Sequence, residues 1–378
     1  MNLTDFKLVK NRFFQSLIIW LLMIITTFPE KNPFLIEKTS PNWKNSNPTS
    51  AEILQRQIEK PNLIIDDFGG AQAGKRQFRL LIPMLGYLTN LDVTDFILIQ
   101  ALLGLVFIYY LIFVLSAQFK FSGYDSFLTT ICLSQTYFIQ SSILDIWPFF
   151  DFIAYFAMTI ILFSQNKLII FILFLAAYFI DERALLGSIG VLLGSFVIEN
   201  KDNIKLKNIL NMKFYIFVFS VLVYFLIRII LVRYFNFKTN TGQLLRGKLA
   251  IFETWKWFKI AFVTTYKSFI FIIPVFLIYF EQQFKKPRNY FIYIIIISIF
   301  YIIIYSFLSL FVYDLTKSLT YLFPLIFSLF ILFVKCQIRY DKRLIINIML
   351  VVNLLIPTMS ITGPVKYVTR SLIERFLF

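Results

Sequence analysis

Long apolar runs recur along the whole chain, and this feature limits most strongly what the chain can fold into. Runs long enough to cross a bilayer follow one another from residue 13 to residue 360, and a membrane-spanning helix needs about 20 predominantly apolar residues. Charged residues make up only 15% of the chain, whereas they make up about 25% of a typical soluble domain. We therefore expect an all-α, polytopic integral membrane protein whose single transmembrane domain covers residues 1–378.

The spacing of the apolar runs predicts about eleven transmembrane helices. We expect these spans at residues 13–28, 94–117, 126–142, 148–164, 168–181, 183–198, 213–234, 261–280, 290–312, 318–335 and 343–360. The runs at 148–164 and 168–181 are short for a straight crossing, so this part of the chain is either strongly tilted or re-entrant. We expect a hairpin over 168–198, because a single helix there would place Asp181, Glu182 and Arg183 in the middle of the membrane.

The first span has the polarity of a signal peptide but lacks its cleavage site. Lys7, Lys10 and Arg12 precede the apolar run, and no small-x-small sequence follows it. We expect an uncleaved helix with a cytoplasmic N-terminus. The next segment, 29–93, is predicted to be an extracytoplasmic loop that contains an interfacial helix at about residues 77–89.

Lysine and arginine are distributed as the positive-inside rule requires. With the N-terminus inside, the cytoplasmic loops receive the basic groups near residues 120, 167, 201–213, 285–288 and 335–343. This placement explains the net charge of +16 without a nucleic-acid partner. The segment 235–260 becomes a second large outer loop, whose lysines either are simply solvated or bind an anionic headgroup. Such a protein is typical of a bacterial inner membrane.

The chain contains no histidine, so any catalysis depends on carboxylates, lysine, arginine or tyrosine. Acids contribute little to topology, and on this topology most of them face outward. The outward acids are Asp66, Asp67, Asp145, Asp151, Asp181, Glu182 and Asp314. Each acid taken alone is explained better as a solvated turn residue or a helix cap than as part of a site, and Asp145 is a candidate N-cap before Pro148. Their gathering at one face is what suggests a site.

Cations accompany these acids at the expected outer surface. Arg79, Arg183 and Lys317 lie near it, and Arg228 lies inside the span at 213–234. An arginine within a span normally binds a carboxylate or an anionic ligand, so Arg228 has two alternatives: ligand binding, or a salt bridge to an acid such as Asp181. Cations or a carboxylate-held metal ion would stabilise a leaving phosphate while another carboxylate accepts a proton.

Four stretches carry a resemblance to a known class of enzyme. They are FRLLIPML (78–85), WPFFDF (147–152), DERALL (181–186) and YDLTKSLTYLFP (313–324). Together with the first outer loop and its interfacial helix, they make the chain resemble the GT-C class of polytopic glycosyltransferases. The resemblance implies transfer of a sugar from a polyprenyl-phosphate donor on the extracytoplasmic face, in the synthesis of a cell-surface glycan.

The resemblance also implies roles for particular acids. GT-C enzymes usually place the catalytic acid soon after the first helix, which nominates Glu30, but here the acidic pair Asp66 and Asp67 comes more than thirty residues later. The outer-loop role is therefore carried over to Asp66 or Asp67, with Glu30 as the alternative. Metal dependence on Mg²⁺ or Mn²⁺ and the oligomeric state are left open.

Two other functions remain as alternatives. A transporter or flippase of lipid-linked oligosaccharide would have charged residues near the middle of the membrane, and only Arg228 and Lys267 lie within the expected spans away from their ends. A polysaccharide polymerase would share the lipid-linked substrate. The enzyme is preferred because the charged residues gather at one surface.

Overall fold

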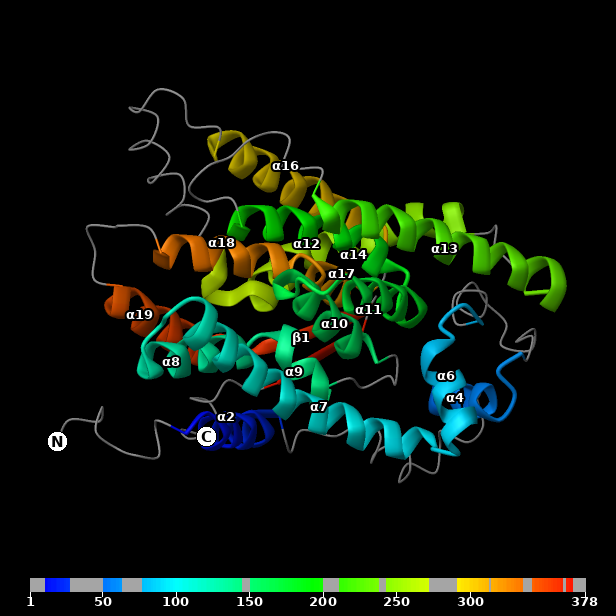
Figure 1. Ribbon diagram of the computed structural model, residues 1–378, viewed down its shortest axis with the longest axis horizontal. Coiled ribbons are helices and arrows are strands. Elements are labelled where there is room, and N and C mark those ends of the chain that lie inside the picture. Colours follow the sequence, from blue (N-terminus) through cyan, green and yellow to red (C-terminus); the bar gives the residue numbers. More distant parts are fainter. Residues whose placement is uncertain are drawn as a thin grey trace.

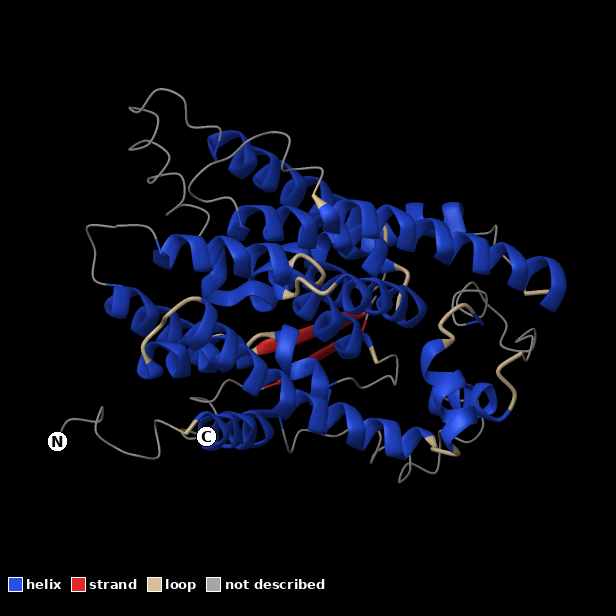
Figure 2. Cartoon of the chain, in the orientation of Figure 1, coloured by secondary structure: helices blue, strands red, loops and turns tan. Residues whose placement is uncertain are grey.

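The computed structural model of the chain is mostly helical, with one short two-stranded sheet (Figure 2). It describes residues 11–27, 50–62, 77–144, 150–199, 211–237, 243–271, 291–312, 314–335, 342–362 and 365–369. The helices of the first half are α2 (Arg12–Thr27), α4 (Ser50–Glu59), α6 (Leu81–Thr89), α7 (Val93–Phe113) with its π-helical extension η3 (Val114–Gln118), α8 (Gly123–Ser134), α9 (Tyr137–Leu144), α10 (Asp151–Phe163) and α11 (Lys167–Ile180). The second half contains α12 (Arg183–Glu199), α13 (Met212–Phe235), α14 (Gln243–Tyr266), the 3₁₀ helix η5 (Lys267–Phe271), α16 (Phe291–Ser309), α17 (Leu315–Thr320), α18 (Phe323–Lys335), α19 (Lys342–Leu355), β1 (Thr358–Thr362) and β2 (Val365–Thr369).

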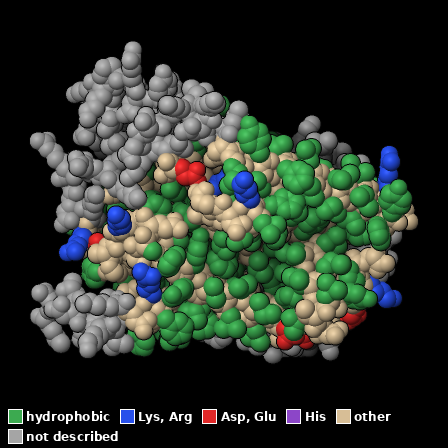
Figure 3. All heavy atoms as spheres, viewed as in Figure 1, with side chains coloured by type: hydrophobic (Ala, Val, Ile, Leu, Met, Phe, Trp, Pro, Cys, Tyr) green, Lys and Arg blue, Asp and Glu red, His purple; other side chains and the backbone are tan. Residues whose placement is uncertain are grey.

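Within the described residues, two segments are long and apolar enough to cross a membrane: Val93–Gln118 and Met212–Phe235. Only 11% of the most apolar part of the second segment is buried inside the molecule, and 39% of the first. The core helix of a soluble protein would be mostly buried, whereas these two helices expose apolar surface along most of their length. Figure 3 shows the same character over the visible face, where hydrophobic side chains form broad connected areas.

Most of the expected apolar segments are helices in the structure, and several differ in their bounds. The run at 126–142 is divided into α8 and α9 by a break at residues 135–136. The predicted loop at 235–260 is wrong for most of its length, because α14 begins at Gln243, well before the expected span at 261–280. The last expected span ends at Leu355, and the chain continues as an antiparallel hairpin of β1 and β2, which an all-α prediction did not include.

Two more expectations concern the turns. The hairpin at 168–198 is confirmed, since α11 ends at Ile180 and α12 begins at Arg183. The segment at 77–89, which was predicted to be interfacial, is helical from Leu81 to Thr89 as α6. An amphipathic helix not expected from the sequence, α4, packs on it.

Glycines on one face of α12 allow it to approach α18 closely. A Cβ atom on Gly187 would lie 3.0 Å from Tyr321, and one on Gly194 would lie 2.4 Å from Oγ of Ser328. Small residues at such spacing let two helix backbones pack at short distance. This contact fixes the start of α12 against the segment that leads into α18.

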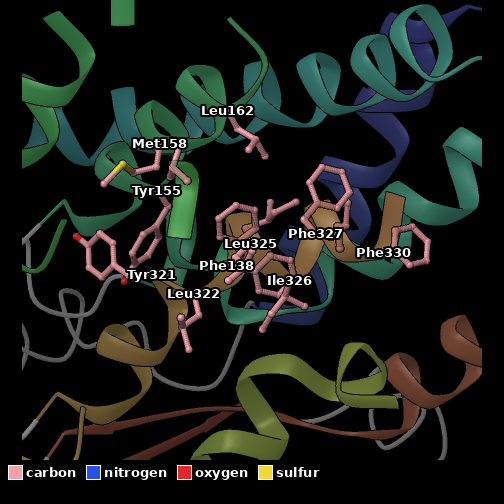
Figure 4. Packing of buried hydrophobic residues seen from close by; sticks show 14 of the residues in the cluster. Phe138, Tyr155, Met158, Leu162, Tyr321, Leu322, Leu325, Ile326, Phe327 and Phe330 are labelled. Atoms are coloured by element: carbon pink, nitrogen blue, oxygen red, sulfur yellow. The ribbon is translucent and has the colours of Figure 1, made fainter. Parts of the chain in front are cut away.

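The core of the bundle is rich in aromatic side chains (Figure 4). Phe138 of α9 stacks on Phe323 of α18 with ring centroids 4.4 Å apart, and Tyr155 of α10 meets Tyr321 edge to face at 4.8 Å. Aromatic pairs in these geometries contribute about 0.5–1.5 kcal/mol beyond their buried area. In Figure 4, Tyr155 and Tyr321 lie together at one side of this core, far from Phe330.

The two ends of the bundle carry different charged residues. At one end, Arg12 lies over the ring of Phe113, Lys213 pairs with Glu199 at 2.9 Å and Arg343 with Asp125 at 3.4 Å. The helices α10 and α12 begin at the opposite end, and α11 ends there. Figure 1 shows α8 and α19 at one end of the longest axis and α4 and α6 at the other.

Helices α4 and α6 form a small second core with the start of α7. Ile58, Ile82, Phe96 and Phe150 are buried in it. It lies beside α11 and so forms a layer over one end of the bundle. Arg79, which precedes α6, connects this layer to the bundle.

Candidate functional site

Seven charged side chains meet at the end of the bundle where α10 and α12 begin. We call this group the end network, and its members are Arg79, Asp151, Asp181, Glu182, Arg183, Asp314 and Lys317. They come from the segment before α6, the start of α10, the turn between α11 and α12, and the start of α17. These are connections that lie far apart in the sequence.

Asp181 is the most heavily engaged acid of the end network. Its carboxylate lies 3.0 Å from Nη2 of Arg79 and 2.6 Å from Nη2 of Arg183, and the hydroxyl of Tyr321 donates a hydrogen bond to Oδ2 at 2.9 Å. The side chain is fully buried. Burying a carboxylate is unfavourable unless it is paired and hydrogen-bonded, and Asp181 meets both conditions.

Asp151 joins all three cations. Its Oδ2 lies 3.0 Å from Nζ of Lys317 and 3.2 Å from Nη2 of Arg183, and its Oδ1 lies 3.4 Å from Nη1 of Arg79. Since Asp151 is the first residue of α10, its negative charge also complements the positive end of the helix dipole. Asp151 and Asp181 therefore share Arg79 and Arg183.

Arg183 reaches across to α17 as well. Its Nη1 donates to the backbone oxygen of Asp314 and to Oγ of Ser318, each at 3.4 Å. On the same segment, the hydroxyl of Tyr155 donates to the backbone oxygen of Lys317 at 3.0 Å. The segment that leads into α18 is thus held to α10 and α12 by polar contacts as well as by ring packing.

Local backbone geometry explains why two of the acids point into the end network. Asp181 accepts a hydrogen bond at 3.2 Å from the backbone N–H of Arg183, the first residue of α12, and so satisfies one of the free N–H groups at the start of that helix. Phe150 has φ of 58°, a left-handed conformation that costs a bulky residue about 1–2 kcal/mol. This turn directs the chain into α10 at Asp151.

The electrostatics of Arg79 are dominated by its acidic neighbours. Burial by itself lowers the pKa of the guanidinium, but Asp181, Glu182 and Asp151 outweigh burial and raise this pKa above its ordinary value. Arg79 therefore stays charged, and it joins the layer of α4 and α6 to the bundle.

Exposure divides the end network into a buried part and a rim. The side chains of Asp151, Asp181 and Lys317 are at most 2% exposed, whereas those of Glu182 and Asp314 are 26% and 23% exposed. The two rim acids also lie farther from the guanidinium groups: Glu182 is 3.9 Å from Nε of Arg79, and Asp314 is 3.9 Å from Nη1 of Arg183. A ligand approaching from outside would meet the rim acids first, beside Arg79 and Arg183.

Several residues predicted from the sequence are not in this group. Glu30, Asp66, Asp67 and Asp145 lie outside the described residues, so their roles stay predictions. Arg228 lies in α13 with its guanidinium 4.0 Å from the ring centroid of Phe78.

The contacts of Arg228 differ from the ion pair considered for it. It donates to the hydroxyl of Tyr224 at 3.2 Å, while the described ion pairs of Asp181 are with Arg79 and Arg183. The salt bridge between Arg228 and Asp181 is therefore not formed. The described contacts of Arg228 are with aromatic side chains, whose ring faces attract a cation, and sequence reasoning considered only charged partners.

Tyr155 and Tyr321 contribute hydroxyl groups to the end network, but neither was predicted from the sequence as a site residue. Both lie in apolar runs where a tyrosine has no distinguishing pattern. The available signal was that a buried tyrosine hydroxyl needs a hydrogen-bond partner, and that Tyr321 follows Lys317 by one helical turn.

Metal binding was left open by the sequence. The described residues include no group of three or more histidine, cysteine, aspartate or glutamate side chains arranged to hold a metal ion. In the end network, the buried carboxylates are occupied by arginine, lysine and tyrosine.

No protein-family model, curated protein or solved structure matches this chain.

Proposed function

We propose that this chain is a polytopic membrane glycosyltransferase that transfers a sugar from a polyprenyl-phosphate donor at the extracytoplasmic face, with about eleven spans. The observation that carries the proposal is the end network, which gathers cations and carboxylates from distant connections at one end of a bundle with an apolar exterior.

The exposed apolar surface supports a membrane location. Along α13, the side chains of Phe219, Leu222, Leu226 and Ile229 are each more than half exposed. Soluble monomers rarely expose contiguous apolar patches larger than a few hundred Å². Lipid is the environment in which such a helix face is stable, and this face extends over the full length of α13.

The composition of the rim supports a phosphate-bearing substrate. Arginine binds phosphate through planar, paired hydrogen bonds, and Arg79 and Arg183 keep partly exposed side chains beside Glu182 and Asp314. In this proposal the guanidinium groups stabilise the departing lipid phosphate. A carboxylate removes the proton from the acceptor hydroxyl, and Asp66 or Asp67, with Glu30 as the alternative, is assigned that role by the resemblance to GT-C enzymes.

The two buried acids take a different role. Asp151 and Asp181 are enclosed and paired with cations, so they position Arg79 and Arg183 and do not react. This division leaves Glu182 and Asp314 as the acids of the end network that a substrate can reach.

A flippase of lipid-linked oligosaccharide is the second candidate, and one observation favours it. Lys267 is buried inside the bundle, away from the end network, and transporters place ionisable groups and interrupted helices near the middle of the membrane. An enzyme of the proposed kind has no need of such a residue.

The direct test is transfer activity of the full-length protein in lipid nanodiscs supplied with polyprenyl-phosphate-linked radiolabelled sugars. The Asp66→Asn, Asp67→Asn double variant should lose transfer while inserting normally, and Asp125→Asn, an acid at the other end of the bundle, should keep it. Full transfer by the double variant would remove this pair from the mechanism. Movement of the intact lipid-linked sugar between leaflets without cleavage would favour the flippase.

A further inference from the structure

The middle of the bundle contains a second polar site, where three interrupted segments meet. The break between α8 and α9, the junction of α14 with η5, and the end of α19 before β1 are connected by hydrogen bonds. Asn353 of α19 donates from Nδ2 to the backbone oxygen of Cys132 at 2.8 Å and accepts at Oδ1 from the backbone N–H of Ser268 at 2.9 Å. Thr358 of β1 donates to the backbone oxygen of Gln135 at 3.1 Å.

The depth of this site follows from the helices that reach it. Asp125 and Arg343 pair in the first turns of α8 and α19 at one end of the bundle, and Cys132 and Asn353 lie seven and ten residues farther along. At 1.5 Å per residue the site is about 10–15 Å below that end. A hydrocarbon core is about 30 Å thick, so in a membrane whose hydrocarbon core begins at that end of the bundle the site is near the middle.

Lys267 is the charged residue at this position. Its side chain is 2% exposed, and its Nζ donates to the backbone oxygen of Asn353 at 3.2 Å. That oxygen is available because its normal helical donor, four residues later, would be Pro357, which has no N–H. The negative end of the α19 dipole also favours a cation here.

One carbonyl does not compensate a buried ammonium group, which has three N–H donors. The ion pairs of the described residues place no carboxylate on Lys267, and a buried charge without a counter-charge costs several kcal/mol. Two residues near it in the sequence add to the excess of donors: Thr265 Oγ1 and Ser268 Oγ are buried and have no hydrogen-bond partner among the described residues. Lys267 also has φ of 48°, in the left-handed region that a residue with a side chain rarely adopts. The chain holds the lysine there at a cost.

We propose that Lys267 is the centre of an internal anion site that binds a phosphate group, with hydroxyls from Thr265 and Ser268 as further donors. A phosphate supplies several acceptor oxygens and a negative charge, which are the two things this position lacks. A neutral polar ligand would supply acceptors but would not compensate the charge. This proposal does not depend on the transferase activity, since it concerns a different part of the molecule from the end network.

The test is the thermal stability of the full-length protein in nanodiscs of neutral lipid. A ligand that binds the folded state raises the unfolding temperature in a concentration-dependent way. We expect inorganic phosphate to raise it, relative to sodium chloride at equal ionic strength. A second experiment uses farnesyl phosphate, with farnesol as its control. Comparing the two experiments distinguishes binding of a lipid phosphate from binding of the free phosphate ion.

Variants assign the effect to a position. In Lys267→Met, the apparent affinity for the phosphate compound that stabilises the wild-type protein should fall at least tenfold. In Ser268→Ala it should fall less. Lys213→Met, which removes a buried lysine that pairs with Glu199, should keep the wild-type affinity.

Three results would overturn the proposal. The first is a wild-type protein that neither phosphate stabilises beyond its control, which decides the matter even if Lys267→Met fails to fold. The second is chloride acting as well as phosphate. The third is a phosphate effect that is unchanged in Lys267→Met and also unchanged in Ser268→Ala. That result would indicate that phosphate binds at the end network instead.

Discussion

The end network and the Lys267 site bury positive charge in opposite ways. In the end network, Arg79, Arg183 and Lys317 are each within 3.4 Å of an aspartate, and the acids come from several connections. Lys267 has a backbone oxygen as its described acceptor, and the ion pairs of the described residues include none with its side chain. The first arrangement is stable as it stands, and the second is one that a ligand would complete.

The largest expected effect is in the end network. Asp181→Asn keeps the volume of the side chain but removes the charge that Arg79 and Arg183 share, so the free energy of unfolding should fall by about 3–5 kcal/mol. Denaturation of the protein in mixed micelles measures it. Asp125→Asn, part of an exposed pair with Arg343, is the matched control and should change stability by at most about 1 kcal/mol. Equal losses in the two variants would show that burial of Asp181 has no special cost.

Arg79→Met tests whether the end network joins the layer of α4 and α6 to the bundle. Charged hydrogen bonds of this kind contribute about 1.5–3 kcal/mol, and the loss should be local. Hydrogen exchange should become faster in α4 and α6 while that of α18 stays unchanged. Uniformly faster exchange, or no change in α6, would contradict this role.

Arg228→Met should have a smaller effect. The residue loses its contact with the ring of Phe78 and its hydrogen bond to Tyr224, and a partly buried cation–π contact contributes about 0.5–2 kcal/mol. Arg228→Lys should restore part of this, because an ammonium also binds a ring face. A loss as large as that in Asp181→Asn would indicate a carboxylate partner instead.

Lys267→Met should have the smallest effect on stability in the absence of phosphate. Removing a buried charge without a counter-charge offsets the loss of its bond to Asn353, so the free energy of unfolding should stay within about 1 kcal/mol of wild type or rise. The same micelle denaturation measures it. A loss of 3 kcal/mol or more would mean that Lys267 is compensated after all, and the contrast between the two regions would disappear.

Sequence reasoning located the end network better than it located the breaks in the helices. Asp151, Asp181 and Asp314 could be placed at one end because each follows or precedes an apolar run of helical length. The break after Ser134 and the helix that begins at Gln243 could not be found this way, because hydropathy measures burial and not the tertiary contacts that end a helix.

The Lys267 site illustrates the same limit. The sequence shows a lysine within an apolar run, and Pro357 predicts an unpaired carbonyl four residues earlier. That these two groups meet depends on how α14 and α19 pack, which no local pattern encodes. The partners of Arg228 were likewise missed because an aromatic ring is not recognised as a partner for charge when only acids are considered.

The central claim is that the end network lies at the outer face of a membrane and that the pairs at the other end lie at the inner face. Single cysteines at Glu182 and Asp314, and at Lys167 and Arg343, introduced after replacement of Cys132 and Cys336 by serine, can be labelled in intact cells with a membrane-impermeant maleimide. The account predicts labelling at Glu182 and Asp314 from outside, and labelling at Lys167 and Arg343 only after the cells are permeabilised. Labelling of Glu182 and Arg343 from the same side would contradict it.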